Sequence, residues 1–236
     1  MTEKYIFPSV SFFCPAYHDE ANLPELIPKV VEFLRLNSRQ FEIIIINDSS
    51  PDATGRVADD LARQYSEVYA VHHARNMGYT ATLIDGYHRA KYEYVIYTDG
   101  DNQYDINDLE PHLNLLKSND LIAGYAIQKA VSRGRLFQSW LHNYLIGVLF
   151  GVGFLDINCS MKVLHRSVLD EMDFKSSAQG AFIDAEIMLK ATRNNKRIAQ
   201  FPVVHYERKS GIASGSKPSL ILYTIWDMVK LRLNLL

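Results

Sequence analysis

The sequence has few cysteines, little net charge and no long apolar run. Two cysteines among 236 residues, Cys14 and Cys159, are too few for a disulfide framework, and their separation matches no zinc or redox spacing. A formal net charge of −2 argues against nucleic acid as a partner. No stretch of about 20 uncharged apolar residues occurs, and the N-terminus lacks a signal-peptide pattern. We therefore expect a reduced, cytoplasmic protein without a membrane-spanning helix.

The composition and the pattern of apolar residues predict a globular α/β domain. Hydrophobic residues make up 47% of the chain and charged residues 22%, which is typical of a folded domain. In the first half, strands are predicted at 10–14, 41–46, 68–72, 94–98 and 121–123, and helices at 22–36, 53–65, 78–90 and 107–117. The β-branched run from Ile43 to Ile46 is typical of a strand covered on both faces. This alternation predicts βαβ units in a Rossmann-like, doubly wound, mostly parallel sheet.

The second half of the chain is less regular. Residues 140–155 are rich in apolar residues and glycine, 181–192 and 219–236 have helical periodicity, and 198–205 read as a strand. From Lys190 onward basic residues outnumber acidic ones by nine to two, which suits phosphate groups or an anionic membrane as well as an ordinary solvated face.

We predict one domain over residues 1–217 and a C-terminal amphipathic helix over residues 218–236. This helix either lies on a membrane or packs against the core or a second copy of the chain. The protein would then be peripheral on the cytoplasmic face of a membrane in the first case and a homo-oligomer in the last.

Two carboxylates follow the strand predicted at 94–98. Asp99 and Asp101 stand two residues apart, so on an extended segment they point the same way, and Gln103 adds an amide oxygen nearby. Such oxygens suit Mg²⁺ or Mn²⁺, an ion that bridges a diphosphate and stabilises the charge of the leaving group. An isolated Asp-x-Asp is usually a solvated turn, but its position at the end of a buried strand favours a metal site.

Two further polar clusters follow the first and second predicted strands. Residues 15–20 include Tyr17 and Asp19, and an aromatic ring with an acidic neighbour can stack on a base and accept hydrogen bonds from it. Residues 47–52 include Asp48, whose carboxylate can accept from a nucleobase N–H. Helix capping and turn chemistry also explain both clusters. Because all three clusters fall at one edge of the predicted sheet, we expect a ligand site there.

Taken in order, these motifs resemble those of family 2 glycosyltransferases, which have a GT-A fold. Residues 43–52 look like that family's strand followed by Asp-Asp-Gly-Ser-x-Asp, and residues 99–103 resemble its Asp-Ala-Asp-x-Gln metal motif. Residues 156–162 and 208–217 resemble the Asp-x-Thr-Ser-Gly-Phe-Arg and Arg-x-x-Gly-x-Ser-Lys segments of the dolichol-phosphate mannose synthase-like group. The resemblance covers residues 8–217.

The resemblance implies roles for three sets of residues. Pro15, Tyr17, Asp19 and Asp48 would hold the nucleoside, Asp99, Asp101 and Gln103 the metal and diphosphate, and Arg208 and Lys217 a phosphate. The catalytic residues would be Asp101, Arg208 and, near the acceptor, Asp184.

Three positions depart from the family pattern. Asn47 replaces an Asp, and Lys162 stands where Arg is usual. Ala126 stands where the group has an Arg, a cation that Arg133 or Arg135 would supply.

We predict a metal-dependent, inverting glycosyltransferase that uses a nucleotide-diphosphate sugar. The acceptor would be a polyprenyl phosphate such as dolichyl or undecaprenyl phosphate, which is already ionised and needs no base. The alternative acceptor is a saccharide hydroxyl in cell-surface polysaccharide synthesis, which needs a carboxylate such as Asp184 or Glu186 as general base. On a helix these two diverge by about 200°, so only one can face the site.

Two other classes of function are open. A non-catalytic scaffold would bind lipid or partner proteins, although Asp99, Asp101 and Gln103 are intact. A nucleotidyltransferase would need a Gly-rich basic loop after the first strand, and residues 14–17 lack one.

Overall fold

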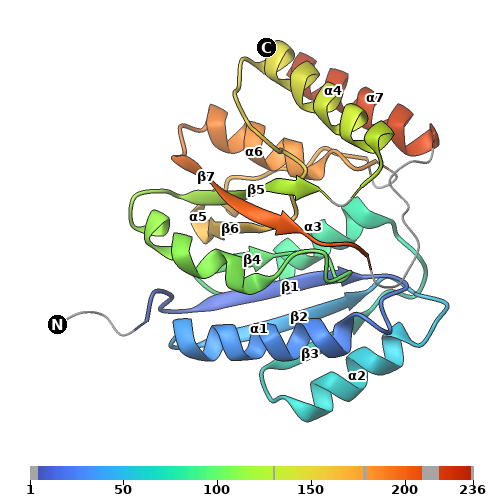
Figure 1. Cartoon of the computed structure of the whole chain (residues 1–236), viewed down its shortest axis with the longest axis vertical. Helices are drawn as coiled ribbons and strands as arrows, with labels where there is room; N and C mark the ends of the chain where they lie inside the picture. Colours follow the sequence, from blue (N-terminus) through green and yellow to red (C-terminus); the bar gives the residue numbers. More distant parts are fainter. Residues whose placement is uncertain (1–4, 130, 178–179, 209–217, 235–236) are drawn as a thin grey trace.

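The computed structural model describes residues 5–129, 131–177, 180–208 and 218–234, and its centre is a seven-stranded sheet (Figure 1). The strand order is β3-β2-β1-β4-β6-β5-β7, which confirms the predicted α/β class and doubly wound arrangement. The strands are β1 (Val10–Ala16), β2 (Phe41–Asn47), β3 (Val68–His72), β4 (Tyr94–Tyr97), β5 (Leu121–Lys129), β6 (Lys162–His165) and β7 (Ile198–His205). The helices are α1 (Leu23–Asn37), α2 (Thr54–Gln64), α3 (Tyr79–Arg89), the 3₁₀ helix η1 (Ile106–Lys117), α4 (Arg133–Phe150), α5 (Arg166–Leu169), α6 (Ile183–Arg193) and α7 (Pro218–Asn234).

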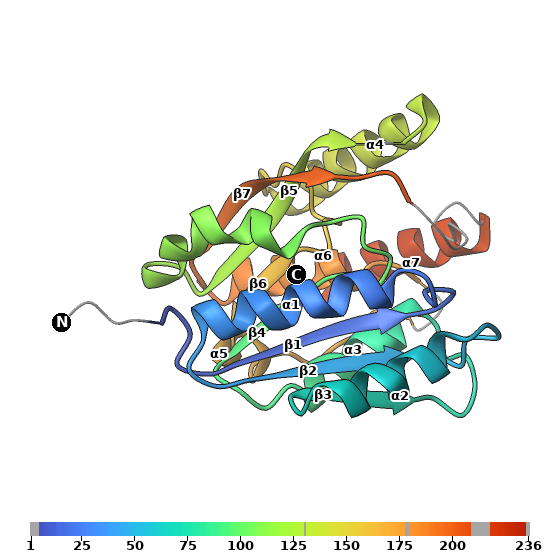
Figure 2. The same ribbon diagram turned by 60° about the horizontal axis from the view of Figure 1, so that its bottom comes forward.

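The first four strands of the chain are paired in parallel. β1 pairs in parallel with β2 on one side and with β4 on the other, and β2 pairs in parallel with β3. The run from Ile43 to Ile46 is buried throughout, as its β-branched composition predicts. Residues of α1, α2 and η1 pack in the core on one face of the sheet, and residues of α3 and α6 pack on the other (Figure 2). Since these strands are parallel, the loops that follow β1, β2 and β4 meet at one edge.

The structure differs from the sequence prediction in the second half of the sheet. The unpredicted strand β6 runs antiparallel between β4 and β5, so the sheet is mixed although mostly parallel. A strand of four residues shows no periodicity, and only pairing with distant strands defines it. β5 reaches Lys129 instead of ending at Ala123, because β7 pairs along most of its length. η1 is a 3₁₀ helix where an α-helix is expected, and Pro111 within it lacks an amide hydrogen.

α4 and α7 lie side by side at one end of the molecule, beyond α6 (Figure 1). Residues 133–150, of which the sequence pattern indicated only an irregular apolar stretch, form α4, and Ile146 is its one buried residue. α7 packs Met228 and Leu231 into the cluster that contains Phe182 of the α6 N-terminus. No helix among the described residues is both long and apolar enough to cross a bilayer. The division predicted between residues 217 and 218 stays a prediction, because residues 209–217 lie outside the described part.

Candidate active site

Three strained loops form the edge of the sheet where β1, β2 and β4 end. Each loop has one non-glycine residue in the left-handed region, with φ of 62° at His18, 55° at Ser49 and 56° at Asn102. Such conformations cost free energy and cluster at functional sites. The first and third loops also touch: a Cβ on Gly100 would lie 2.6 Å from the Pro15 carbonyl oxygen, which accepts the Gly100 amide. The edge of the sheet that was predicted to bind a ligand is therefore formed by loops that pack closely against each other.

Two of the side chains predicted to bind a metal, Asp101 and Gln103, contact the guanidinium group of Arg208. Arg208 donates to Asp101 Oδ2 and, at 3.1 Å, to Gln103 Oε1. Gln103 is fixed in turn, since its backbone amide donates to Asp101 Oδ1 at 3.1 Å and its Nε2 donates to the Tyr206 carbonyl at 3.0 Å. The structure thus brings Arg208 to two predicted residues, Asp101 and Gln103, that precede it by more than a hundred positions. Lys217, the other predicted phosphate contact, lies outside the described residues.

Asp99 has an oxygen that no described residue satisfies. Its Oδ1 is buried and has no hydrogen-bond partner in the described part of the chain, while its backbone amide donates to Ser160 Oγ at 3.4 Å. Burial, together with the nearby carboxylates of Asp101 and Asp184, raises the pKa of Asp99 to about 8. A cation placed here would relieve both the unsatisfied oxygen and the charge repulsion.

These residues suit a hard divalent ion. Two carboxylates and an amide oxygen are ligands typical of Mg²⁺ or Mn²⁺, and the Arg208 guanidinium shows that cationic charge is favourable at Asp101 and Gln103. The described residues contain no group of three or more His, Cys, Asp or Glu side chains that could hold an ion by themselves. The remaining ligands would therefore come from a bound diphosphate and water, as in sites that take Mg²⁺ with a substrate.

Asp19 forms the inner wall beside this centre. Its Oδ2 accepts the Tyr17 amide at 2.8 Å, its Oδ1 accepts Asn22 Nδ2 at 2.8 Å, and its own amide donates to Thr54 Oγ1. Burial raises the pKa of Asp19 to about 6 against the opposing effect of these hydrogen bonds. The Tyr17 ring is 43% exposed, so it remains available to a ligand at the loop surface.

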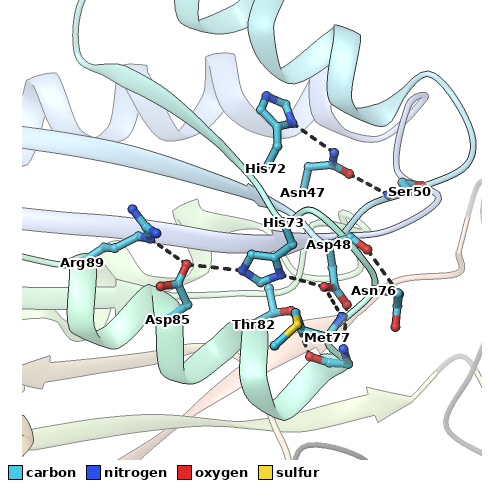
Figure 3. A network of polar contacts seen from close by, with 11 residues as sticks. Asn47, Asp48, Ser50, His72, His73, Asn76, Met77, Thr82, Asp85 and Arg89 are labelled. Carbon is cyan, nitrogen blue, oxygen red and sulfur yellow. Dashed lines mark hydrogen bonds and ion pairs between the residues drawn. The ribbon is translucent and has the colours of Figure 1, made fainter.

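Asp48 shapes the turn between β3 and α3 (Figure 3). Its Oδ1 faces His73 Nδ1 and accepts the Met77 amide, both at 2.7 Å, and its Oδ2 accepts the Gly78 amide at 2.9 Å. His73 also faces Asp85 at 3.4 Å. Three contacts on a buried carboxylate leave little capacity for a nucleobase. Asp48 therefore organises the loop beside the predicted nucleoside site, a role for which sequence reasoning offered no signal.

Asn47, which stands where the family has Asp, is held by a different histidine. Its Nδ2 lies 3.0 Å from His72 Nδ1, and its Oδ1 accepts the Ser50 amide at 3.0 Å (Figure 3). Neither His72 nor His73 stood out in the sequence, because their spacing matched no metal site. Their function becomes visible only when β2 and β3 are paired.

Asp184 is buried in an ion pair. Lys162 Nζ lies 2.5 Å from its Oδ1, and the Lys162 side chain is fully buried. The Tyr97 hydroxyl donates to Asp184 Oδ1 at 2.9 Å, and the Tyr79 hydroxyl donates to its Oδ2 at 3.4 Å. Lys162 was noted only as a substitution for Arg, so this partnership was missed. Both oxygens of the Asp184 carboxylate are therefore already occupied by donors from the chain itself.

Glu186 faces away from Asp184, as the helical spacing predicted. It accepts the backbone amides of Lys175 at 2.7 Å and Ser176 at 2.8 Å, and it pairs with Lys190 at 2.6 Å. These contacts anchor the chain in front of α6 and use both carboxylate oxygens. Of the two acidic residues, only Asp184 borders the candidate site.

A cavity of about 380 Å³ opens between α4, α6 and α7, and Asp184 and Tyr79 are among the residues that line it. Its apolar walls come from Leu141, Leu145, Ile221, Ile225 and Met228. Arg135, His142 and Asn158 are its other notable lining residues. The cavity thus has both polar lining residues, among them Asp184, and apolar walls from the exposed helices.

The sequence profile described as Glycosyl transferase family 2 matches residues 11–173. The chain belongs to this family. Its order of motifs, from the loop after β1 to Lys162, lies within the matched region, so the predicted resemblance is confirmed. The glycosyltransferase activity predicted from that resemblance follows from family membership.

Curated relatives of this glycosyltransferase are about a quarter identical to it. Dolichyl-phosphate beta-glucosyltransferase ALG5D of Trichomonas vaginalis is 25% identical and matches 96% of this chain and 72% of its own. Dodecaprenyl-phosphate galacturonate synthase of Rhizobium johnstonii is 27% identical, with 86% and 61% covered. Polyprenol monophosphomannose synthase of Mycolicibacterium smegmatis is 26% identical, with 86% and 79% covered. The chain therefore spans only part of each relative's length.

Solved structures support the GT-A fold of this family 2 glycosyltransferase. Glucosyl-3-phosphoglycerate synthase from Mycobacterium tuberculosis superposes with a TM-score of 0.73 at 16% identity, covering 94% of this chain and 79% of that one. Mannosyl-3-phosphoglycerate synthase from Rubrobacter xylanophilus gives a TM-score of 0.68 at 16% identity, covering 96% and 74%. At this level of identity the likeness concerns the fold alone.

Proposed function

We propose that this chain transfers a sugar, with inversion, from a nucleotide-diphosphate sugar to a polyprenyl phosphate. The observation that carries the proposal is the cavity between α4, α6 and α7. Its apolar walls suit a hydrocarbon chain, Asp184 and Tyr79 form part of its polar lining, and Arg135 supplies a cation for a phosphate. The names of three relatives, which refer to dolichyl phosphate, dodecaprenyl phosphate and polyprenol, support this acceptor class.

On the donor side, Asp99, Asp101 and Gln103 would hold Mg²⁺ or Mn²⁺ with the diphosphate. The ion would stabilise the charge on the leaving nucleoside diphosphate. Arg208 already contacts Asp101 and Gln103, so it would lie beside the same phosphates. A solved relative in fold, glucosyl-3-phosphoglycerate synthase, is described in complex with Mn²⁺ and uridine diphosphate, which supports the metal.

The nucleoside would lie against the loops after β1 and β2. The exposed ring of Tyr17 and the carboxylate of Asp19 would contact the base or ribose, with Pro15 forming the floor. Asp48 would act indirectly, because it holds the turn before α3 in place. Phosphate contact by Lys217 stays part of the proposal.

On the acceptor side, no general base is required. A phosphate oxygen is ionised at neutral pH and attacks the anomeric carbon as the bond from that carbon to the diphosphate breaks. Lys162, Tyr97 and Tyr79 occupy both oxygens of Asp184, so neither is open to an acceptor hydroxyl, which favours a phosphate over a saccharide hydroxyl. Asp184 and Tyr79 would instead shape the place where the two substrates meet.

The exposed sides of α4 and α7 would rest on a membrane. Trp140 is 57% exposed, Phe137 61%, Trp226 61% and Leu222 69%, an unusual number of large apolar side chains for a water-exposed surface. A C-terminal helix over residues 218–236 would thus be an interfacial element added to the transferase domain. Flotation of the protein with liposomes would detect this contact. If the protein is instead a dimer that does not bind liposomes, a second copy of the chain covers the helices.

The test of the proposed function is transfer from a panel of nucleotide sugars to polyprenyl phosphate or to saccharide acceptors. We expect transfer to polyprenyl phosphate only, loss of it in EDTA, and no transfer by Asp101→Ala. The exposed acidic residue Glu110 on η1 supplies the matched control, Glu110→Ala, which should retain activity. Thermal shift gives an independent readout: a nucleotide should stabilise the wild type more with Mn²⁺ present. Transfer to saccharides alone, or full activity of Asp101→Ala in metal-free buffer, would overturn the proposal.

A further inference from the structure

Asp227 fixes α7 to the chain that leads into α6. The residue is 2% exposed, its Oδ2 accepts the Ser177 amide at 2.8 Å, and its Oδ1 accepts the Ser177 hydroxyl at 2.6 Å. Lys230, one turn along α7, lies 3.8 Å away and is 38% exposed. Burying a carboxylate is costly unless it is hydrogen-bonded, and hydrogen bonds to a charged group are strong. The two bonds to Ser177 therefore define where α7 sits.

Two neighbouring contacts hold the same stretch of chain. The Ala181 amide donates to Thr224 Oγ1 at 3.3 Å, and Thr80 Oγ1 of α3 donates to the Gly180 carbonyl at 2.8 Å. A Cβ on Gly180 would lie 2.7 Å from Asp227 Oδ2, so the close approach requires glycine at this position. Ser177, Gly180 and Ala181 are thus held between α3 and α7.

The C-terminal end of these contacts, at Ala181, reaches the cavity proposed for the acceptor. Ala181 and Thr224 both line the cavity, as does Asp184, the second residue of α6. Thr80 is next to Tyr79, whose hydroxyl donates to Asp184. Among the described residues, the hydrogen bonds and ion pairs of Asp227 and Ser177 join them to each other and to Lys230, and none reaches the donor-side loops after β1, β2 and β4.

We propose that Asp227 is a positioning residue for the acceptor. By holding Ser177, it sets the distance between α7 and the start of α6 and so the shape of the cavity wall. It acts through that wall and touches neither the donor nor the reacting atoms. The inference rests on the proposed function in one respect, that the acceptor enters this cavity.

Steady-state kinetics of Asp227→Asn, Ser177→Ala and the double variant test the proposal. Each single variant should raise the acceptor KM about tenfold, the effect of one lost hydrogen bond to a charged group, while the donor KM stays within about twofold. Both substitutions remove the charge-assisted bond between the Ser177 hydroxyl and the Asp227 carboxylate, so the double variant should be no worse than the more impaired single variant. Lys230→Gln is the matched control: it leaves the bonds to Ser177 intact and should leave the acceptor KM unchanged.

The outcomes separate this inference from the proposed function. If the wild type uses a saccharide acceptor, the acceptor class is wrong, yet the same comparison of acceptor and donor KM still applies. An unchanged acceptor KM in Ser177→Ala, the milder variant, would overturn the positioning role. So would equal rises in both KM values, because a general loss of structure acts on both substrates. Additive effects in the double variant would show that the two residues act separately, which also contradicts the proposal.

Discussion

Lys162 and Asp184 form a buried ion pair, with Nζ 2.5 Å from Oδ1 and the lysine side chain fully buried. Lys162 also donates to the Cys159 carbonyl, and the Tyr97 hydroxyl donates to Asp184, so both charges have additional hydrogen bonds. A buried pair of this kind is stable only when such bonds are complete. Asp184 therefore has a structural role at the candidate site, where its ion pair with Lys162 joins α6 to β6.

The first prediction separates the two acceptor classes. Asp184→Asn should keep most of its turnover, because a phosphate acceptor needs no base, whereas Arg208→Ala should lose most of it. Loss of a general base typically lowers the rate by about 10²–10⁴-fold, so initial rates at saturating substrates distinguish the cases. An inactive Asp184→Asn that still binds nucleotide would identify a hydroxyl acceptor with Asp184 as its base.

The second prediction concerns the stability of the ion pair. Lys162→Met leaves Asp184 buried without its cation and should lower the free energy of unfolding by about 3–5 kcal/mol. In the double variant with Asp184→Leu no charge is left unpaired, so most of the loss should be recovered. Urea unfolding followed by circular dichroism measures both. A double variant less stable than Lys162→Met would contradict this account.

The third prediction is a pH dependence that arises from His142. Burial lowers the pKa of His142, with Asp156 acting in the opposite direction. A histidine whose folded pKa lies below its unfolded value of about 6.5 contributes stability above that pH, and the contribution is lost as the pH falls. Between pH 7 and pH 5 the wild type should therefore lose stability relative to His142→Gln, by at most about 1.4 kcal/mol per pH unit. If the melting temperatures of the wild type and His142→Gln change in parallel between pH 7 and pH 5, this prediction is wrong.

The fourth prediction compares two glycines in helices. A Cβ on Gly86 of α3 would lie 2.2 Å from Phe13 Cδ2, whereas a Cβ on Gly134 of α4 would meet nothing within 4 Å. Gly86→Ala should therefore destabilise the protein by about 1–3 kcal/mol through overpacking. Gly134→Ala should be neutral or stabilising by up to about 1 kcal/mol, because alanine favours the helix. Equal melting temperatures for the two variants would contradict the packing at Phe13.

The sequence predicts the parallel half of the fold because local patterns determine it. The run from Ile43 to Ile46 and the loop motifs after β1, β2 and β4 each show in a short window of residues. The strand β6 does not, since four residues show no period and antiparallel pairing with β4 depends on distant chain. α4 is concealed for another reason: apolar residues surround most of its circumference, so the stretch lacks the one-sided pattern of a surface helix.

The site was predictable where neighbouring residues act together. Asp99, Asp101 and Gln103 lie within five positions, and the structure places them at the expected edge. Pairs that are distant in sequence, such as Lys162 with Asp184, depend on how β6 meets α6 and leave no local signal. Asp48 shows a different limit: its position at the end of a strand was predicted, but only the structure shows its carboxylate bound by backbone amides.

α4 buries a single side chain, that of Ile146, although it is 18 residues long. Helices with little tertiary packing are marginally stable in water, so this one should open locally at far lower free energy than the sheet beneath it. Its amide hydrogens should exchange quickly in solution and proteases should cleave it first. An apolar surface that covers the helix would slow both exchange and cleavage. The rates of exchange and cleavage in α4 would therefore report whether the enzyme is bound to such a surface.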